Sequence, residues 1–283
     1  MLATRRSKPL KWHGGKHYLA DRIIKLMPVH THYVEPYAGG LSVLFAKPEE
    51  WIVGHSEVVN DLNGELSNFW SVLASEELSG EIIRRLEGTP FSESTWRMAE
   101  ELGRTVISQE DMVESAVQFF IRYRQSRQGL GKDFATLSRN RTRRGMNEQV
   151  SSWLSAVEGL PEAHERLKRV VVLNNDACKV IQQQDGPKTF FYLDPPYLHE
   201  TRKVTDAYQF EMTAEEHFKL LNVLLDVSGK FILSGYRSEL YDAHAEIGAW
   251  PRVDIEIDNK ASSAKKKETK TECLWTNFNP LDQ

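Results

Sequence analysis

Short apolar runs recur in two separate stretches of the chain and predict the strands of a sheet. In the first stretch, residues 33–35 and 58–60 have the character of short strands. In the second, residues 170–173, 190–193 and 230–234 form continuous apolar runs, which are typical of parallel strands buried on both faces. The helical pattern of residues 213–225 separates the last two runs, so they predict a strand–helix–strand unit with parallel strands.

Helices are expected after the early strands and before the first one. Residues 17–27 place Leu19, Ile23 and Leu26 on one face, and Pro28 follows as a stop. Apolar residues at helical spacing also follow Gly40 and Asp61. Near the end, residues 253–257 alternate with period two and precede a second apolar run, residues 273–278, so the two predict a terminal antiparallel hairpin.

The middle of the chain has a different character. Residues 76–167 are charged, helical in pattern and poor in β-branched runs. We therefore predict an α/β core made of residues 1–75 and 168–283, interrupted by a helical insert of residues 76–167. Alternating helices and apolar strands favour a mostly parallel, three-layer sheet, whose ligands bind beyond the carboxyl ends of the strands.

Composition indicates a globular protein of the cytoplasm. Hydrophobic residues make up 40 % of the 283 residues, and no apolar run approaches the ~20 residues of a membrane helix. The first residues lack the apolar segment of a secretory signal. The two cysteines, Cys178 and Cys273, lie far apart and are expected to be reduced thiols.

The net charge of −4 is unevenly distributed. Residues 122–144 contain eight basic residues and one acid, and residues 260–270 contain five lysines and one acid. A basic stripe on a mildly acidic protein is compatible with contact to the phosphates of a nucleic acid, although such runs are often solvated faces.

Two glycine-containing motifs are candidates for a ligand site. Residues 35–40 follow a predicted strand and end in Gly39 and Gly40, which let a ligand approach the backbone because no Cβ intervenes. A tight packing turn would require the same glycines. Residues 11–16 set Trp12 beside a second glycine pair, which suits either a cover for an adenine ring or a basic tail with one hydrophobic anchor.

Asp61 follows the second predicted strand. A carboxylate there could accept hydrogen bonds from ribose hydroxyls or could cap the helix that follows, and the sequence leaves both open.

The tetrapeptide of residues 194–197 is the most informative motif. Its two prolines fix φ and remove two backbone donors, so the Pro195 carbonyl is held rigidly. The Asp194 carboxylate and that carbonyl can together accept both hydrogens of an amino group, and Tyr197 offers a flat face for a planar base. A purely structural turn would need neither the acid nor the aromatic residue.

In their order and spacing, these motifs resemble the Dam family of N6-adenine DNA methyltransferases. The matching segments are residues 11–16, 34–40, 60–63 and 194–197, and residues 272–277 look like the family's final strand. The resemblance implies a Rossmann-like, S-adenosylmethionine-dependent methyltransferase sheet with a terminal antiparallel hairpin and a helical target-recognition insert. It also implies methyl transfer to the N6 amino group of an adenine flipped out of duplex DNA.

The resemblance further implies roles for individual residues. The catalytic residues would be Asp194, Pro195, Pro196 and Tyr197. S-adenosylmethionine would be bound by Trp12, Gly14, Gly15, Lys16, Glu35, Pro36, Ala38, Gly39, Gly40, Asp61, Asp176 and Asp194. Within that set, Asp61 would take the ribose hydroxyls and Lys16 could pair with the methionine carboxylate. Asp176 would contact the cofactor's adenine, although Ala177 stands where the family commonly has an aromatic residue.

Duplex DNA is the expected partner, and the basic segment of the insert is the expected DNA surface. Bases would be read by Arg124, Gln125 and Arg127, and phosphates would be contacted by Arg139, Arg141, Arg143, Arg144, Lys265 and Lys266.

Other classes of protein are weighed against this interpretation. An N4-cytosine methyltransferase shares the chemistry but more often has Ser in place of Asp194. A DNA-binding regulator on a decayed fold would have lost part of the tetrapeptide, which is intact, and a protein or RNA methyltransferase is a third alternative. No metal is expected, a monomer is the default, and a bacterial or phage origin leaves restriction–modification, phage protection and chromosome marking open.

Overall fold

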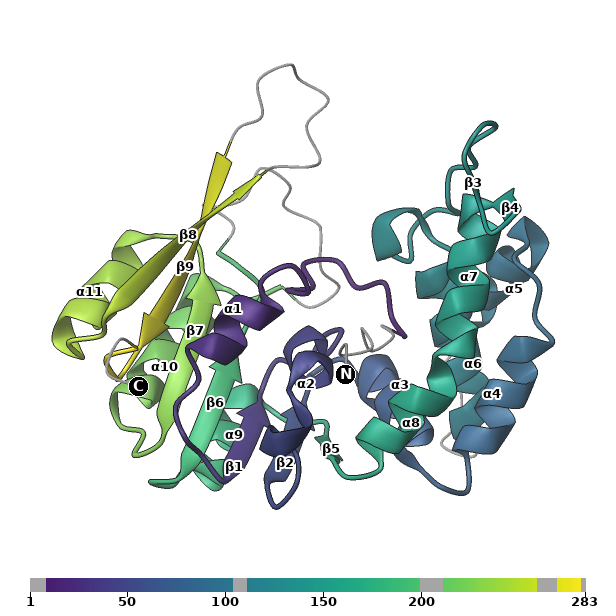
Figure 1. Ribbon diagram of the computed structural model, residues 1–283. Helices are drawn as coiled ribbons and strands as arrows, with labels where there is room; N and C mark the ends of the chain where they lie inside the picture. The colour runs from purple at the N-terminus through teal and green to yellow at the C-terminus, as the bar shows by residue number, and fades with distance from the viewer. Residues whose placement is uncertain (1–8, 104–110, 199–210, 259–268, 281–283) are drawn as a thin grey trace. The chain divides into compact units, whose positions relative to one another are not determined.

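The strands expected from the apolar runs are all found in the computed structural model, which describes residues 9–103, 111–198, 211–258 and 269–280. The chain divides into two units that interleave along the sequence (Figure 1). The first comprises residues 1–24, 39–50 and 63–174, and the second comprises residues 25–38, 51–62 and 175–283. The expected core of residues 1–75 and 168–283 and insert of residues 76–167 stay a prediction.

A mixed sheet dominates the second unit. Its six strands are β1 (His32–Glu35), β2 (Ser56–Asn60), β6 (Thr189–Leu193), β7 (Lys230–Gly235), β8 (Arg252–Asp258) and β9 (Thr269–Thr276). They have the order β2-β1-β6-β7-β9-β8. The first four are parallel to their neighbours, whereas β9 is antiparallel to both β7 and β8. The predicted α/β class, with a mostly parallel sheet and a terminal antiparallel hairpin, is confirmed.

Burial of the central strand explains its apolar run. All five residues of β6 are buried, and Phe190, Phe191 and Leu193 are inaccessible to solvent. Each such side chain contributes roughly 1.5–3 kcal/mol when it leaves water. Helices α9 (Ala177–Gln184), α10 (Ala214–Leu225) and α11 (Glu239–Ile247) belong to the same unit. A capping box of Thr213 and Glu216 begins α10, as the predicted helix at residues 213–225 requires.

Two local expectations are wrong. Residues 170–173 predict a buried strand, but in the observed β5 (Val171–Leu173) Val171 is 53 % exposed and the next two residues are half-buried. This strand belongs to the first unit, outside the six strands described above. The helix expected at residues 17–27 is only α1 (Ala20–Lys25), because residues 17–19 form turns.

The first unit is largely helical, and it includes residues 76–167, whose helical pattern predicted this. Its helices are α2 (Ser42–Ala46), α3 (Gly64–Ala74), α4 (Ser79–Glu87), α5 (Glu93–Gly103), α6 (Met112–Arg124), α7 (Glu148–Glu158) and α8 (Leu160–Leu167). Aromatic rings join them: Phe69 of α3 stacks on Phe120 of α6 at 5.6 Å, and Phe120 lies 5.4 Å from Trp153 of α7. Among the residues that the structure describes, no helix has the length and apolar character needed to cross a membrane.

A small hairpin in the first unit is not predicted from the sequence. It pairs β3 (Thr142–Arg143) with β4 (Met146–Asn147). Between them Arg144 and Gly145 have φ values of 55° and 74°, which is the geometry of a two-residue type I′ turn. The strands have only two residues each, too few for an alternating apolar pattern to reveal them.

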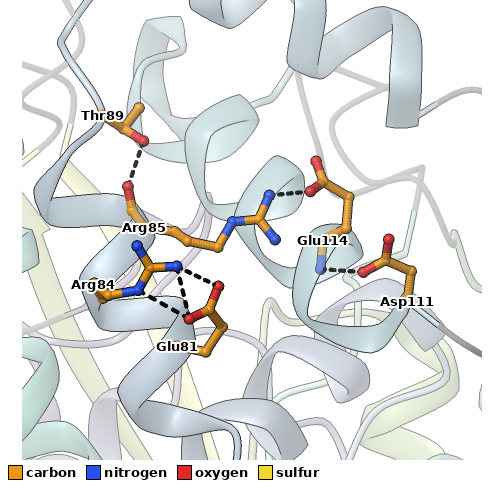
Figure 2. A network of polar contacts seen from close by, with 6 residues as sticks. All are labelled: Glu81, Arg84, Arg85, Thr89, Asp111 and Glu114. Carbon is orange, nitrogen blue, oxygen red and sulfur yellow. Dashed lines mark hydrogen bonds and ion pairs between the residues drawn. The ribbon is translucent and has the colours of Figure 1, made fainter.

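An ion pair links α4 to α6. The Arg85 guanidinium donates to the Glu114 carboxylate, and the Glu114 backbone N–H is capped by Asp111 at 3.0 Å (Figure 2). Burial acts to raise the pKa of Glu114, but hydrogen bonds from Arg85 and Gln118 hold it below its ordinary value. In contrast, Glu81 and Arg84 pair along the exposed face of α4 (Figure 2).

Replacing this carboxylate should have an effect that depends on pH. We expect Glu114→Gln to lower the free energy of unfolding by about 1 kcal/mol at pH 7, since the pair is only partly buried. A depressed carboxyl pKa stabilises the fold above the unfolded pKa, which is roughly 4.3, so the difference from wild type should shrink as the pH falls below that value. Urea unfolding at pH 7 and at a pH of about 3, below the unfolded pKa, measures it. The exposed counterpart Glu81→Gln should change stability by less than half as much at either pH, and a pH-independent loss in Glu114→Gln would contradict the interpretation.

Candidate active site

Trp12 is held within the first unit between α6 and the loop at residues 39–40. Its ring stacks on Tyr123 of α6, with centroids 5.0 Å apart and planes at 29°. A Cβ added at Gly39 would lie 3.0 Å from Trp12 Nε1, and one added at Gly40 would lie 2.8 Å from Trp12 Cβ. The glycine pair is therefore needed for the close approach of Trp12, and Trp70 fixes the loop by donating to the Gly39 carbonyl at 3.1 Å.

The segment of residues 11–16 is a folded turn. Gly14 has a φ of 78°, and the Gly15 N–H donates to the Trp12 carbonyl at 3.3 Å. Lys16 is only 5 % exposed, and its Nζ donates to the Gly14 carbonyl at 3.2 Å. These contacts argue against a loose basic tail with a single anchor.

Three neighbouring strand ends of the second unit carry the remaining motifs. Because β1 pairs in parallel with both β2 and β6, the carboxyl ends of the three strands lie at the same edge of the sheet. Glu35 ends β1, Asp61 follows β2, and Asp194 follows β6. Glu35 is buried and accepts a 2.5 Å hydrogen bond from Tyr33, while burial and this carboxylate raise the pKa of Tyr33. Carboxylates are thus concentrated where ligands of such sheets bind.

Asn60 lies in the matching segment of residues 60–63, but the resemblance gave it no role of its own. Its side-chain amide donates to the carbonyls of Pro36 and Asn175, both at 3.0 Å, and accepts from the Asn175 N–H at 2.8 Å. Its backbone carbonyl accepts from Ala38 at 2.8 Å. One buried side chain therefore fixes the loop that contains Pro36 and Ala38 against the start of α9.

The helix after Asp61 is capped by another residue. The Asn63 side chain accepts hydrogen bonds from the N–H groups of Glu65 and Leu66, at 3.1 and 3.2 Å, and is the N-cap of α3. Since the capping position is filled by Asn63, the capping alternative for Asp61 is not supported.

Asp176, unlike Asp61, does cap the helix that follows it. Its carboxylate caps α9 by accepting from the Lys179 N–H at 3.0 Å, and it also lies 3.6 Å from Lys219. Capping accounts for an acid at this position, so its contact to a cofactor stays a prediction.

The tetrapeptide of residues 194–197 is anchored by a residue of β9, two strands away from β6 in the sheet. Tyr197 is 7 % exposed, and its hydroxyl donates to the carboxylate of Glu272 on β9, which is 1 % exposed. The ring also meets Tyr236 edge-on, with centroids 4.7 Å apart. Burial, with the nearby charges of Asp194 and Glu272, raises the pKa of Tyr197 well above its ordinary value, so the phenol stays protonated. The sequence did not predict a role for Glu272, because nothing in residues 269–276 indicates that a tyrosine 75 residues earlier would be its partner.

Two of the predicted DNA-contacting residues, Gln125 and Arg124, make buried contacts within the first unit. Gln125 is fully buried: its amide donates to the Pro90 carbonyl at 2.9 Å and accepts from the Ser92 N–H at 3.1 Å. Arg124 donates to the Ser152 carbonyl at 2.8 Å, and burial lowers the pKa of Arg124 to about 10. Their contacts suit support of the following turn better than direct contact to a base.

The other basic residues of the insert are exposed. Arg144 pairs with Glu158 at 2.9 Å, and Arg141 lies 3.8 Å from Glu148. Arg127, Arg139 and Arg143 are exposed and have no carboxylate partner in the part of the chain that the structure describes. Lys265 and Lys266 lie outside the described residues. Within the described ranges, no three His, Cys, Asp or Glu side chains are arranged to hold a metal ion.

Comparison with known protein families gives a match over most of the chain. The model of the D12 class N6 adenine-specific DNA methyltransferase family matches residues 12–255. The matched range contains the segment around Trp12, the three strand ends and the tetrapeptide. No curated protein matches the chain.

Capping of α3 by Asn63 can be tested by its effect on stability. We expect Asn63→Ala to lower the free energy of unfolding by about 1 kcal/mol, since two N–H groups lose their acceptor. Asn63→Asp should retain most of the stability, because Asp is an equally good N-cap. Chemical unfolding followed by circular dichroism measures both. Equal losses in the two variants would show that the side chain matters for another reason.

Proposed function

Because the match over residues 12–255 shows that this chain belongs to the D12 class N6 adenine-specific DNA methyltransferase family, it is an adenine-specific DNA methyltransferase, and we propose that it uses S-adenosylmethionine to methylate an adenine flipped out of duplex DNA. The observation that carries the proposal is the intact Asp194–Tyr197 tetrapeptide at a strand end adjoining that of β1.

The tetrapeptide binds and orients the amino group. An adenine within a duplex cannot reach a site at a strand end, so the base must leave the stack at a cost of a few kcal/mol. The Asp194 carboxylate and the Pro195 carbonyl accept its two amino hydrogens. This directs the nitrogen lone pair and stabilises the positive charge that develops on the nitrogen during transfer.

The donor set fits S-adenosylmethionine. Its ribose hydroxyls suit the carboxylate of Asp61, which is not the N-cap of α3, and its carboxylate suits the cation Lys16. Trp12 supplies an aromatic surface, and the proposed cofactor-binding residues also include Gly14, Gly15, Pro36, Ala38, Gly39 and Gly40. When bound, the cofactor supplies a methyl group on a sulfonium, which is a good leaving group, so the transfer needs no covalent enzyme intermediate.

Tyr197 is the proposed stacking surface for the base. Because only 7 % of the side chain is exposed, stacking requires its covering groups to rearrange when DNA binds. The hydrogen bond to Glu272 keeps the hydroxyl end of the ring fixed during that change.

DNA affinity is proposed to come from the exposed arginines of the first unit. Arg139 and Arg143 are available for phosphates, and Arg127 begins the turn that follows α6. Arg141 and Arg144 would exchange carboxylate partners for phosphate. The buried contacts of Gln125 hold the base of this turn and thereby present Arg127.

The reaction can be tested with unmethylated plasmid and tritiated S-adenosylmethionine. Wild type should transfer label to DNA, recovered as N6-methyladenine after digestion to nucleosides, and Asp194→Ala should lower the rate by at least 100-fold, since both orientation and charge stabilisation are lost. Asp226→Ala, which removes an exposed acid of the same unit, should keep the wild-type rate. Label in N4-methylcytosine would contradict the proposed product. S-adenosylmethionine binding without turnover in wild type would favour a silent DNA-binding protein.

Phosphate contacts can be tested through the salt dependence of binding. Each phosphate contact contributes about 0.9 to the slope of log K against log salt, so the double variant Arg139→Ala/Arg143→Ala should reduce the slope by about 2. Anisotropy of a fluorescent duplex between roughly 50 and 200 mM salt measures it. Arg84→Ala, an exposed arginine on α4, should leave the slope unchanged. Equal slopes in the double variant and wild type would exclude these two arginines from the DNA surface.

A further inference from the structure

The turn after α6 touches the backbone of the segment at residues 11–16. In the 3-10 helix η3 (Arg127–Gly129), Gln128 and Gly129 have φ values of 58° and 73°. A Cβ built on Gly129 would lie 2.0 Å from the carbonyl oxygen of Lys11 and 2.8 Å from its carbonyl carbon. The two backbones are therefore in direct contact, and no side chain fits between them.

Hydrogen bonds make this turn a firm support. The Arg127 N–H donates to the Asp133 carbonyl at 2.8 Å, and Ala135 donates to the Gln125 carbonyl at 2.9 Å. Within the turn, the Ser126 hydroxyl accepts from the Gly131 N–H at 2.9 Å. These bonds tie residues 125 and 127, which precede Gly129, to residues 133 and 135 after it. The turn therefore cannot easily shift to make room for a bulkier residue at position 129.

Helix α6 and the turn after it also contact the side chains of Lys11 and Trp12. The Lys11 side chain donates to the Ser126 carbonyl at 3.4 Å. The adjacent Trp12 stacks on Tyr123, which lies three residues before Ser126. The backbone at Lys11 and the ring of Trp12 are thus both positioned by α6 and the turn that follows it.

We propose that Gly129 is a positioning residue for cofactor binding: its turn sets the path of residues 11–16 and so the placement of Trp12 and Lys16 toward S-adenosylmethionine. The inference rests on the proposed function. The turn of residues 127–129 would then have two roles, because it presents Arg127 to DNA and also positions residues 11–16. Displacing the turn must displace those residues.

Gly145 provides a matched control. It has a φ of 74°, nearly that of Gly129, but a Cβ added there meets nothing within 4 Å. Alanine is thus equally strained at both positions, whereas only Gly129→Ala collides with Lys11. Isothermal titration with S-adenosylmethionine, without DNA, compares them. We expect the Kd to rise at least tenfold in Gly129→Ala, since a shift of about 1 Å is enough to misplace binding groups, and to stay within about twofold of wild type in Gly145→Ala.

A merely structural role is separated by thermal unfolding without ligand. If Gly129→Ala lowers the Tm but the folded protein binds S-adenosylmethionine as tightly as wild type, the proposal is wrong. Tyr123→Leu is the second variant if Gly129→Ala does not fold, because it leaves the backbone contact intact and removes the ring beneath Trp12. Its Kd should rise several-fold, and an unchanged Kd would overturn the inference. Failure of wild type to bind S-adenosylmethionine would instead overturn the proposed function on which the inference rests.

Discussion

Parallel pairing of β1 with β2 and β6 is the constraint on which the candidate site depends. A register that sets Glu35 against Val59 and Val34 against Phe191 brings three strand ends to one edge. Acids that are far apart in sequence then lie at the same edge of the sheet. The buried apolar side chains of β6 contribute stability, and the polar residues beyond the strand ends form the candidate site.

Packing around Trp12 shows that the glycines beside it already have a structural role. Gly39 and Gly40 leave room for the indole, and Tyr123 lies against its other side. Glycines beside a ligand site are usually explained by the ligand, but here a protein side chain already needs that space. A substitution at either glycine would therefore displace Trp12 and disturb residues 11–16 even in the absence of a ligand.

Most of the fold could be predicted from the sequence, because strand positions, the strand–helix–strand unit and the terminal hairpin follow from local apolar patterns. The candidate site was predictable where a motif is contiguous, as in residues 194–197. It was not predictable where a role depends on a distant partner. Burial of Gln125 depends on Pro90 and Ser92, and Glu272 acquires its meaning only from Tyr197. Asp61 and Asn63 are both suitable N-cap residues, and only the position of the N–H groups at the start of α3 shows that Asn63 is the cap.

The bond between Tyr197 and Glu272 joins residues 75 positions apart, and β9 lies between β7 and β8 although it follows both along the chain. During synthesis on the ribosome, β6 and the tetrapeptide emerge well before β9. Until β9 inserts, Tyr197 lacks its acceptor and β7 has an unpaired edge. A nonsense mutation ahead of β9 would therefore remove the hydrogen-bond acceptor of Tyr197 while sparing every residue of the tetrapeptide.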